Sequence, residues 1–250
     1  MKQVVFLILI AISAVVICPG SSVATGPVDN RIWATLLKKH VTDGRVDYDG
    51  FKQDEAELDR YLAILSATDP GALSHQHQFA FYINAYNAFT VKLILTRYPG
   101  INSIKEISSF FSNPWSRKFI PLNGFKVSLD HIEHDILRNR FKDPRIHFAI
   151  NCAARSCPPL SNTPYEGDTL ETRLEEQTRQ FINHFGKPFL KDNTLFVSRI
   201  FKWFEDDFSG NPLGFIRQYA DNSLKQALEN ASAGGDIHLE YLPYDWTLNR

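Results

Sequence analysis

The sequence predicts a single compact α+β domain whose centre is one buried helix. Segments typical of helices and strands follow one another without the regular alternation of a doubly wound sheet. Residues 78–98 are apolar on nearly every helical face, as expected of a helix around which a domain packs. The 250-residue chain contains no internal repeat, low-complexity tract or long linker that would divide it further. We therefore expect the central helix to pack against an antiparallel or mixed sheet.

The composition is that of a globular protein. The chain has 27 Lys and Arg against 28 Asp and Glu, a net charge of −1, and 44% of its residues are hydrophobic. These values exclude a disordered charged tail protein. They also argue against a nucleic-acid-binding protein, because such proteins usually carry a basic excess.

The N-terminal residues 1–24 predict a cleavable secretory signal. Lys2 precedes an apolar run over residues 4–18, and Ser22-Val23-Ala24 supplies small side chains for a signal peptidase. The run is shorter than the ~20 residues that span a bilayer, so no stable membrane span is expected after cleavage. Lipid attachment at Cys18 is the alternative, although Ile17 is larger than the residue this route prefers. Residues 25–250 would then form one periplasmic or secreted domain.

The first half of the chain predicts three helices. Residues 29–40 and 56–67 each carry an apolar stripe at helical spacing, and Gly44 between them begins a turn and a short extended segment. The apolar helix over 78–98 follows and ends at Pro99. It contains Asn84 and Asn87, whose spacing places both amides on one side of the helix. Buried amides need hydrogen-bond partners, so we expect both to be paired.

The second half mixes helices and strands. A helix is predicted over 130–140, with Ile132, Ile136 and Leu137 facing inward, and alternating apolar residues predict a strand over 145–152. Three prolines make residues 153–164 a loop. The remaining elements are a helix capped by Asp168 that extends to about residue 184, a strand over 194–197, a helix within 212–230 and a strand over 237–241.

Reactive side chains are densest between residues 130 and 157. This segment contains His131, Glu133, His134, His147, Cys152 and Cys157. A neighbouring imidazole converts a thiol into a good nucleophile, and a carboxylate or amide then orients the imidazole. Cys157 precedes two prolines, so its thiol is expected on a stiff loop rather than in the core. The chain has no P-loop, Gly-x-Ser-x-Gly elbow or dinucleotide-binding glycine pattern, and no cofactor is expected.

Each of these residues also has a structural interpretation. Two cysteines of an exported chain are more often joined, and a Cys152–Cys157 disulfide would add about 2 kcal/mol through its short loop. His134 has Asp130 and Arg138 as natural helical neighbours, whereas the adjacent Glu133 diverges from it by about 100°. A zinc site of His131, His134 and the two thiols is the weakest option, because these spacings are loose for zinc. No metal is therefore expected.

Seven stretches carry a resemblance to a known family. They are Val46–Tyr48, Phe81–Ala88, Leu129–Arg138, Asp143–Cys152, Ser156–Leu160, Ile200–Phe204 and Tyr241–Asn249. Together they resemble the family called domain of unknown function 547, and the chain looks like an exported bacterial member. The resemblance implies a fold similar to papain-like cysteine peptidases, a Cys-His-Glu arrangement, and small thiol peptides such as glutathione as substrates. Carried onto this sequence, it makes Cys157 the nucleophile, with His134 and Glu133 as imidazole and acid and His147 as the reserve base.

Two hypotheses follow. The first is an exported cysteine-dependent hydrolase of short peptides or amides that forms an acyl-enzyme, with Asn84 and Asn87 as oxyanion or supporting residues. The second is a non-enzymatic binding or scaffold domain with a Cys152–Cys157 disulfide. Its aromatic segments 201–208 and 241–246 would form core, which is the commoner role, or a ligand groove. An enzyme needs one ionisable free thiol, and a disulfide-bonded scaffold needs none.

Overall fold

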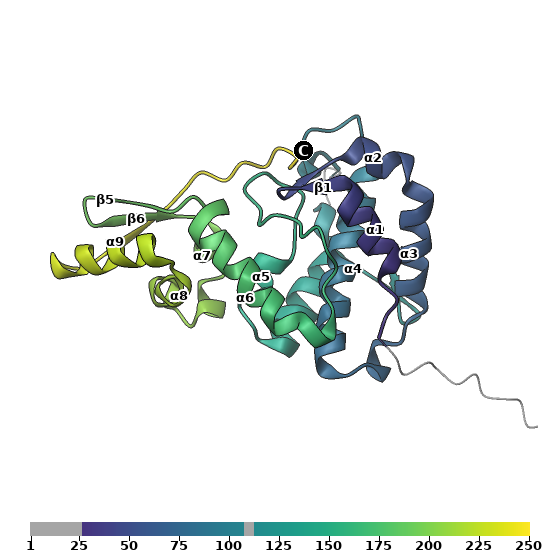
Figure 1. Cartoon of the computed structure of the whole chain (residues 1–250). Helices are drawn as coiled ribbons and strands as arrows, with labels where there is room; N and C mark the ends of the chain where they lie inside the picture. The colour runs from purple at the N-terminus through teal and green to yellow at the C-terminus, as the bar shows by residue number, and fades with distance from the viewer. Residues whose placement is uncertain (1–26, 108–112) are drawn as a thin grey trace, which may run out of the picture.

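The computed structural model describes residues 27–107 and 113–250, so the predicted signal at residues 1–24 lies outside the described residues. The described chain is mostly helical with three small sheets, which confirms a single mixed α+β domain. Helices α1 to α4 lie at one end of the molecule, and α8, α9 and strands β5 and β6 lie at the other (Figure 1). Within the described residues, no helix combines the length and apolarity needed to cross a bilayer.

The N-terminal helices form largely where the sequence predicts them. Helix α1 (Arg31–His40) is followed by a hairpin of β1 (Val41–Thr42) and β2 (Arg45–Val46), and α3 (Glu55–Ala67) confirms the second predicted helix. Helix α2 (Tyr48–Gln53) was not predicted. It begins at Asp47, whose carboxylate accepts the Gly50 N–H at 2.9 Å.

The central helix α4 (His75–Leu95) is buried on nearly all faces, as predicted. Its main neighbours are α2, α3 and the helical segments η4 (His131–Phe141) and η5 (Gly167–Thr169). Among the described residues, helices rather than the expected sheet provide most of its packing. The physical reason is that the strands are only two to four residues long and cannot cover a 21-residue helix.

The region after α4 contains a short hairpin and a wide helix. Strands β3 (Ile120–Leu122) and β4 (Phe125–Val127) pair antiparallel and were not predicted. Segment η4 confirms the predicted helix, but it is wound as a π-helix. Ile132 and Leu137 are fully buried on it, whereas Ile136 is only partly buried.

Residues 145–152 do not form the predicted strand. They form a short helix, α5 (Ile146–Ala149), followed by an extended loop that continues through the predicted loop at 153–164. All four residues of α5 are buried, so the apolar alternation there does not mark one buried and one exposed face. Asp143 accepts the Arg145 N–H at 2.9 Å and favours the turn that begins this helix.

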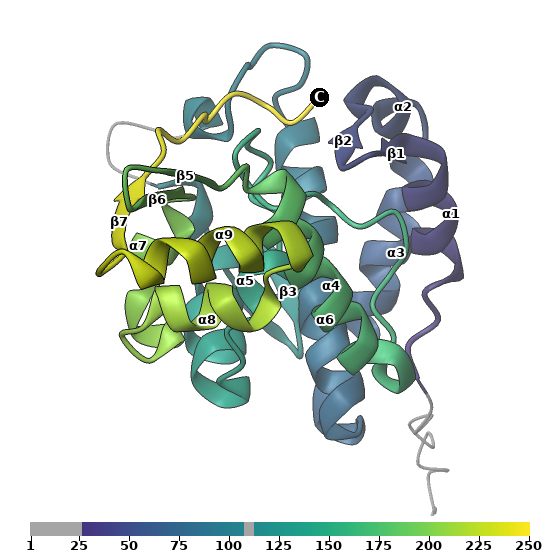
Figure 2. The same cartoon turned by 60° about the vertical axis from the view of Figure 1, so that its left-hand side comes forward.

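The C-terminal half contains the largest sheet. Strand β6 (Thr194–Val197) pairs antiparallel with β5 (Phe189–Lys191) and parallel with β7 (His238–Tyr241), which confirms the two predicted strands. Helix α6 (Leu170–Gln180) and its continuation η6 (Phe181–Phe185) also confirm a prediction, although Asp168 lies within η5 and does not cap the helix. Figure 2 shows α8 and α9 covering one side of the sheet.

The helix predicted within 212–230 is two helices. Helix α8 (Pro212–Tyr219) ends at Ala220, and α9 (Asn222–Ala233) begins anew. The break occurs because the Asp221 carboxylate accepts the Leu224 N–H at 3.1 Å and caps the second helix. Two short segments, α7 (Ile200–Trp203) and η7 (Glu205–Phe208), precede α8 and carry the second apolar cluster together with α5 and η6.

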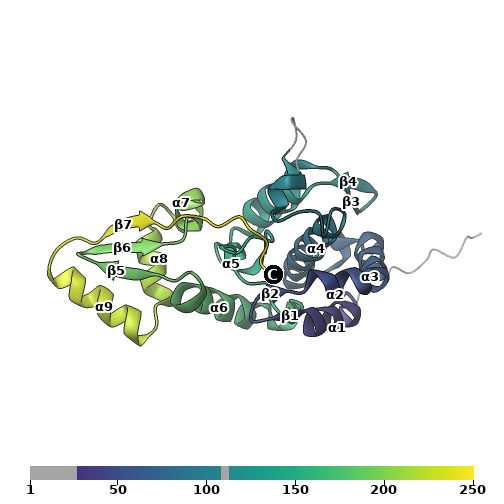
Figure 3. The same ribbon diagram turned by 90° about the horizontal axis from the view of Figure 1, so that it is seen from above.

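The chain end returns across the molecule to its N-terminal half, as Figure 3 shows from above. The Asn249 carbonyl accepts the Val46 N–H at 2.9 Å, and Leu248 forms an isolated bridge with Ala154. The Thr247 carbonyl accepts the Arg155 N–H at 2.8 Å. Because of these bonds, residues 244–249 lie along the loop that contains both cysteines. The chain end therefore contributes side chains to the site.

Candidate functional site

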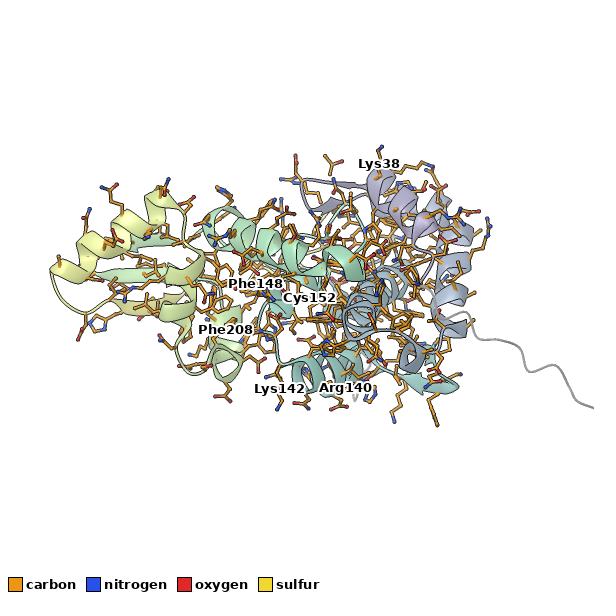
Figure 4. The ribbon with its side chains drawn as sticks, turned by 60° about the horizontal axis from the view of Figure 1, so that its bottom comes forward. Lys38, Arg140, Lys142, Phe148, Cys152 and Phe208 are labelled. Carbon is orange, nitrogen blue, oxygen red and sulfur yellow. The ribbon has the colours of Figure 1, made fainter. Side chains whose placement is uncertain are left out.

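A cavity of about 220 Å³ lies where the two halves of the molecule meet. Figure 4 shows Cys152 near the middle of the molecule, between the α1–α4 end and the α8–α9 end. The lining comes from α4, η4, α5, the cysteine loop, α7 and the returning chain end. Five sequence-predicted site residues line it, namely Glu133, His134, His147, Cys152 and Cys157.

The two cysteines form a close pair of free thiols. The Cys152 N–H donates to the Cys157 Sγ at 2.8 Å, across the tight turn in which Cys157 N–H bonds the Ala154 carbonyl. The Tyr244 hydroxyl lies 3.4 Å from the Cys152 Sγ. The predicted disulfide is therefore absent in this structure, but the loop keeps both sulfur atoms at one point of the cavity wall.

The surroundings of the two thiols favour ionisation of Cys152 over ionisation of Cys157. A hydrogen bond from the Cys157 thiol lowers the pKa of Cys152, and the Tyr244 hydroxyl and Ala154 N–H act in the same direction. Burial raises the pKa of Cys157 well above its ordinary value. This pattern differs from the expectation carried over from the family resemblance, which makes Cys157 the nucleophile.

His147 is oriented by a carboxylate that the sequence prediction missed. Its Nε2 lies 2.6 Å from Asp207 Oδ2, and its ring stacks on Phe204 at a centroid distance of 3.9 Å. Burial alone would raise the pKa of Asp207, but hydrogen bonds from His147 and Arg138 hold this pKa well below its ordinary value. An ionised Asp207 accepts the proton of Nε2, so the lone pair of a neutral His147 lies on Nδ1. Within the described chain, Nδ1 has no hydrogen-bond partner, which leaves it open to a substrate.

Burial of the imidazole determines its charge. Burial lowers the pKa of His147, despite the opposing hydrogen bond to Asp207 and the negative charge of Glu133. The neutral form is therefore favoured near pH 7, which is the form a general base requires.

His134 is placed differently, although it lines the same cavity. The Arg138 Nη1 lies 3.1 Å from His134 Nδ1, and a guanidinium can only donate. Nδ1 must therefore accept, and Nε2 carries the proton at 4.0 Å from Asp130 Oδ1. The Nδ1 of His134 is thus occupied by Arg138, whereas the Nδ1 of His147 has no partner among the described residues, so the geometry favours His147 as the base.

Glu133 acts on the site through its charge. It is 9% exposed, and its Oε2 accepts the Tyr86 hydroxyl at 3.0 Å. Among the described contacts, no hydrogen bond joins Glu133 to His134, as expected for side chains that diverge on neighbouring helical positions. Its negative charge raises the pKa of His147 and so favours a proton on that imidazole.

Asn84 and Asn87 are paired, as predicted, but neither lines the cavity. The Asn84 amide bonds the backbone N–H and carbonyl of Tyr165 at 2.9 and 2.7 Å. The Asn87 amide donates to the Ala149 carbonyl at 3.0 Å and accepts the Asn151 N–H at 2.8 Å. Because both side-chain amides bond backbone groups away from the cavity, the structure does not place either of them where an oxyanion could form. Asn87 is a supporting residue, because it anchors the segment between His147 and Cys152.

Asn151 is a further supporting residue for the cysteine loop. Its amide donates to the Pro158 carbonyl at 2.7 Å, and its oxygen accepts the Ala153 N–H at 2.9 Å. The Asn249 amide donates to the same oxygen at 3.2 Å. Asn151 thus connects both ends of the loop to the returning chain end.

Aromatic side chains form a further part of the cavity lining, called the aromatic wall below. Its members are Trp115, Trp203, Phe204, Tyr244 and Trp246. Tyr244 lies 4.6 Å from Trp246 and 4.8 Å from Trp203, measured between ring centroids. The core-packing interpretation of segments 201–208 and 241–246 therefore holds for Phe201 and Phe208, which are buried, but not for these cavity-lining rings.

Local patterns mark some of the site residues that the sequence prediction missed. The acidic run Glu205-Asp206-Asp207 lies between Phe204 and Phe208, and a carboxylate inside an aromatic segment indicates a buried polar contact. Tyr86 lies within the buried helix, where a hydroxyl needs a partner. No comparable pattern marks Trp115.

The zinc arrangement that the spacing left open is not assembled. His131 Nδ1 bonds Asp135 Oδ2 at 2.7 Å on the outer side of η4, away from the thiols. Over residues 27–107 and 113–250, no group of three or more His, Cys, Asp or Glu side chains is arranged to hold a metal ion.

Residues 70–182 match the family described as "Protein of unknown function, DUF547". The matched segment includes α4, η4, α5 and the cysteine loop. Asp207 and the aromatic residues at 203–246 lie beyond the matched range. No curated protein and no solved structure matches the chain.

Proposed function

We propose that the DUF547 domain, together with the C-terminal half that completes its cavity, is a cysteine-dependent hydrolase of short peptides or amides. The observation that carries the proposal is the presence of the thiol pair and the Asp207-oriented His147 in the lining of one cavity. A cavity of about 220 Å³ admits a short substrate and no cofactor is needed for this chemistry.

The reaction uses Cys152 as the nucleophile and His147 as the base. Nδ1 of His147 takes the Cys152 proton, and the thiolate attacks the carbonyl carbon of the amide. The C–N bond then breaks as His147 returns the proton to the leaving amine, which leaves a thioester. Water attacks the thioester and gives a proton to Nδ1. The C–S bond then breaks, Nδ1 returns this proton to the Cys152 sulfur, and the carboxylic acid leaves.

Two residues support the charged species of this sequence. Asp207 orients the imidazole and stabilises its protonated form, the function that a carboxylate has in hydrolytic triads on unrelated folds. The Tyr244 hydroxyl, 3.4 Å from the Cys152 Sγ, is the donor best placed to meet the oxygen of an attacked carbonyl. It takes the role that the sequence assigned to Asn84.

The proposal includes a relation to papain-like cysteine peptidases in chemistry and an exported location. The Cys–His–carboxylate arrangement supports the first, with Asp207 in the place expected for Glu133. The apolar run at residues 4–18 and Ser22-Val23-Ala24 support the second, as expected of a periplasmic or secreted protein.

A second candidate is a binding or scaffold domain in which the two cysteines are oxidised. The close approach of the thiols, shown by the 2.8 Å contact of Cys152 N–H with Cys157 Sγ, favours a disulfide in an oxidising compartment. Such a molecule would lack the nucleophile, so the two candidates differ in their response to reductant.

Hydrolysis of a library of short fluorogenic amides, with and without reductant, tests the proposal. We expect turnover by the reduced wild type and its loss in Cys152→Ala. Cys157→Ala is the matched control: it removes only the neighbouring thiol and should retain measurable turnover. Full activity of Cys152→Ala contradicts the proposed nucleophile, and loss confined to Cys157→Ala assigns that role to Cys157. Thermal unfolding of each variant shows whether it has folded.

A further inference from the structure

We propose that the substrates carry a primary ammonium group, which binds between the acidic side chains and the aromatic wall of the cavity. The inference rests on the proposed hydrolase function, because the ammonium would lie on the acyl part of the amide that Cys152 attacks. It concerns substrate class, which the thiol chemistry alone does not determine.

The charges of the cavity are unbalanced. Asp130 and Glu133 line it, and none of the described lining residues is Lys or Arg. The Arg138 guanidinium, which also attracts Glu133, bonds both oxygens of Asp207 at 2.6 and 3.0 Å, so its charge is shared with Asp207. Among the described residues, neither Asp130 nor Glu133 forms a salt bridge with a Lys or Arg side chain.

Both carboxylates are poorly satisfied within the chain. Glu133 is nine-tenths buried, and only its Oε2 has a hydrogen-bond partner among the described residues, the Tyr86 hydroxyl. Asp130 lies 4.0 Å from His134, and burial raises the pKa of Asp130. A buried carboxylate without a cation costs free energy, and a bound ammonium would remove that cost.

The aromatic wall also suits a cation. Faces of Trp and Tyr rings attract cations through their quadrupole, and Trp is the strongest of them. The chain itself provides an example, since Lys105 Nζ lies 3.6 Å from the ring centroid of Trp246. Trp203 and Tyr244 present further ring area beside Trp246.

The same charges disfavour peptides with free carboxylates. A substrate carboxylate would face Asp130 and Glu133 in a low-dielectric cavity without a lining guanidinium or ammonium group. Glutathione-like peptides, which the family resemblance implies, carry such carboxylates. We therefore expect aminoacyl amides to be better substrates than acidic thiol peptides.

Matched substrates test this inference through turnover. We compare leucine amide of a fluorogenic amine with its N-acetyl and N-succinyl derivatives, which remove the ammonium or replace it with a carboxylate. We expect kcat/KM to be at least about tenfold higher for the free amine, a difference of about 1.4 kcal/mol. Asp130→Asn should reduce this preference. The matched control is Asp135→Asn, which removes the same charge from an exposed position of η4 outside the cavity.

Binding to Cys152→Ala separates the inference from the hydrolase proposal. Quenching of tryptophan fluorescence is measured with leucinamide and with N-acetylleucinamide, neither of which needs to be hydrolysed. Tighter binding of leucinamide, lost in the Asp130→Asn background, supports the inference even if no amide is hydrolysed. Equal binding of the two compounds, or equal turnover of the free and acetylated substrates, overturns it and leaves the hydrolase proposal in place.

Discussion

Asn87 connects the central helix to the segment between His147 and Cys152, and its replacement with Leu gives a prediction that does not depend on substrate. The substitution keeps the number and branching of the side-chain heavy atoms and removes two hydrogen bonds, to the Ala149 carbonyl and the Asn151 N–H. A buried backbone group left without a partner costs about 1–3 kcal/mol, so two cost about 2–6 kcal/mol. Burial of the Leu side chain offsets about 1–2 kcal/mol of this. We expect a net loss of about 1–4 kcal/mol in the free energy of unfolding.

Asn84→Leu is the matched control for this experiment. Asn84 lies on the same helix and makes the same pair of bonds, but to Tyr165, which does not line the cavity. Both variants should lose similar stability in chemical denaturation. Only Asn87→Leu should change the alkylation rate of Cys152, because only that variant releases the backbone leading to the thiol. A stability loss below about 1 kcal/mol, or equal changes of the thiol rate in both variants, would refute the reasoning.

Three further predictions address the site. Iodoacetamide at pH 7 should modify Cys152 before Cys157, as measured by peptide mass spectrometry, because the hydrogen bond from Cys157 lowers the pKa of Cys152. Faster modification of Cys157 would contradict this order. If neither cysteine reacts before reductant is added, the two form a disulfide. Asp207→Asn should lower kcat for amide hydrolysis by about 10²-fold or more, because His147 loses its orienting carboxylate. A kcat within about twofold of the wild-type value would show that Asp207 does not orient the base. Burial lowers the pKa of His147 in the folded state below its unfolded value of about 6.5. The neutral imidazole therefore contributes stability that is fully present above pH 6.5 and is lost as the pH falls toward the folded-state pKa. Wild-type denaturation between pH 7 and 5 should show this loss, up to about 1.4 kcal/mol per pH unit, and His147→Gln should show a smaller slope.

The parts of the fold that the sequence predicts well are those with a strong local pattern. The apolar segment ending at Pro99 gave α4 to within three residues at each end, and the stripe at Leu58, Tyr61 and Leu62 gave α3. The packing partners of α4 were not predictable in this way. The packing partners depend on which segments, distant in sequence, place apolar side chains against α4. Nothing in the local sequence shows that the strands are too short to cover this helix.

The site was predictable where its residues are chemically unusual and close in sequence. Glu133, His134, His147, Cys152 and Cys157 lie within 25 residues, and the structure places all five in one lining. Asp207 and Trp246 come from segments far along the chain. Their positions depend on contacts such as Arg155 N–H with the Thr247 carbonyl, which no local pattern encodes.

The incorrect strand at 145–152 explains why the sequence could not choose between the two histidines. In a strand, His147 and Cys152 are five positions apart, so their side chains would point to opposite faces. Helix α5 replaces the first half of that strand, and the chain then turns into an extended loop at Ile150. The two side chains can therefore reach the same cavity. The bonds that fix this turn come from Asn87, about 60 residues earlier in the chain, so one buried amide joins the fold to the chemistry of the site.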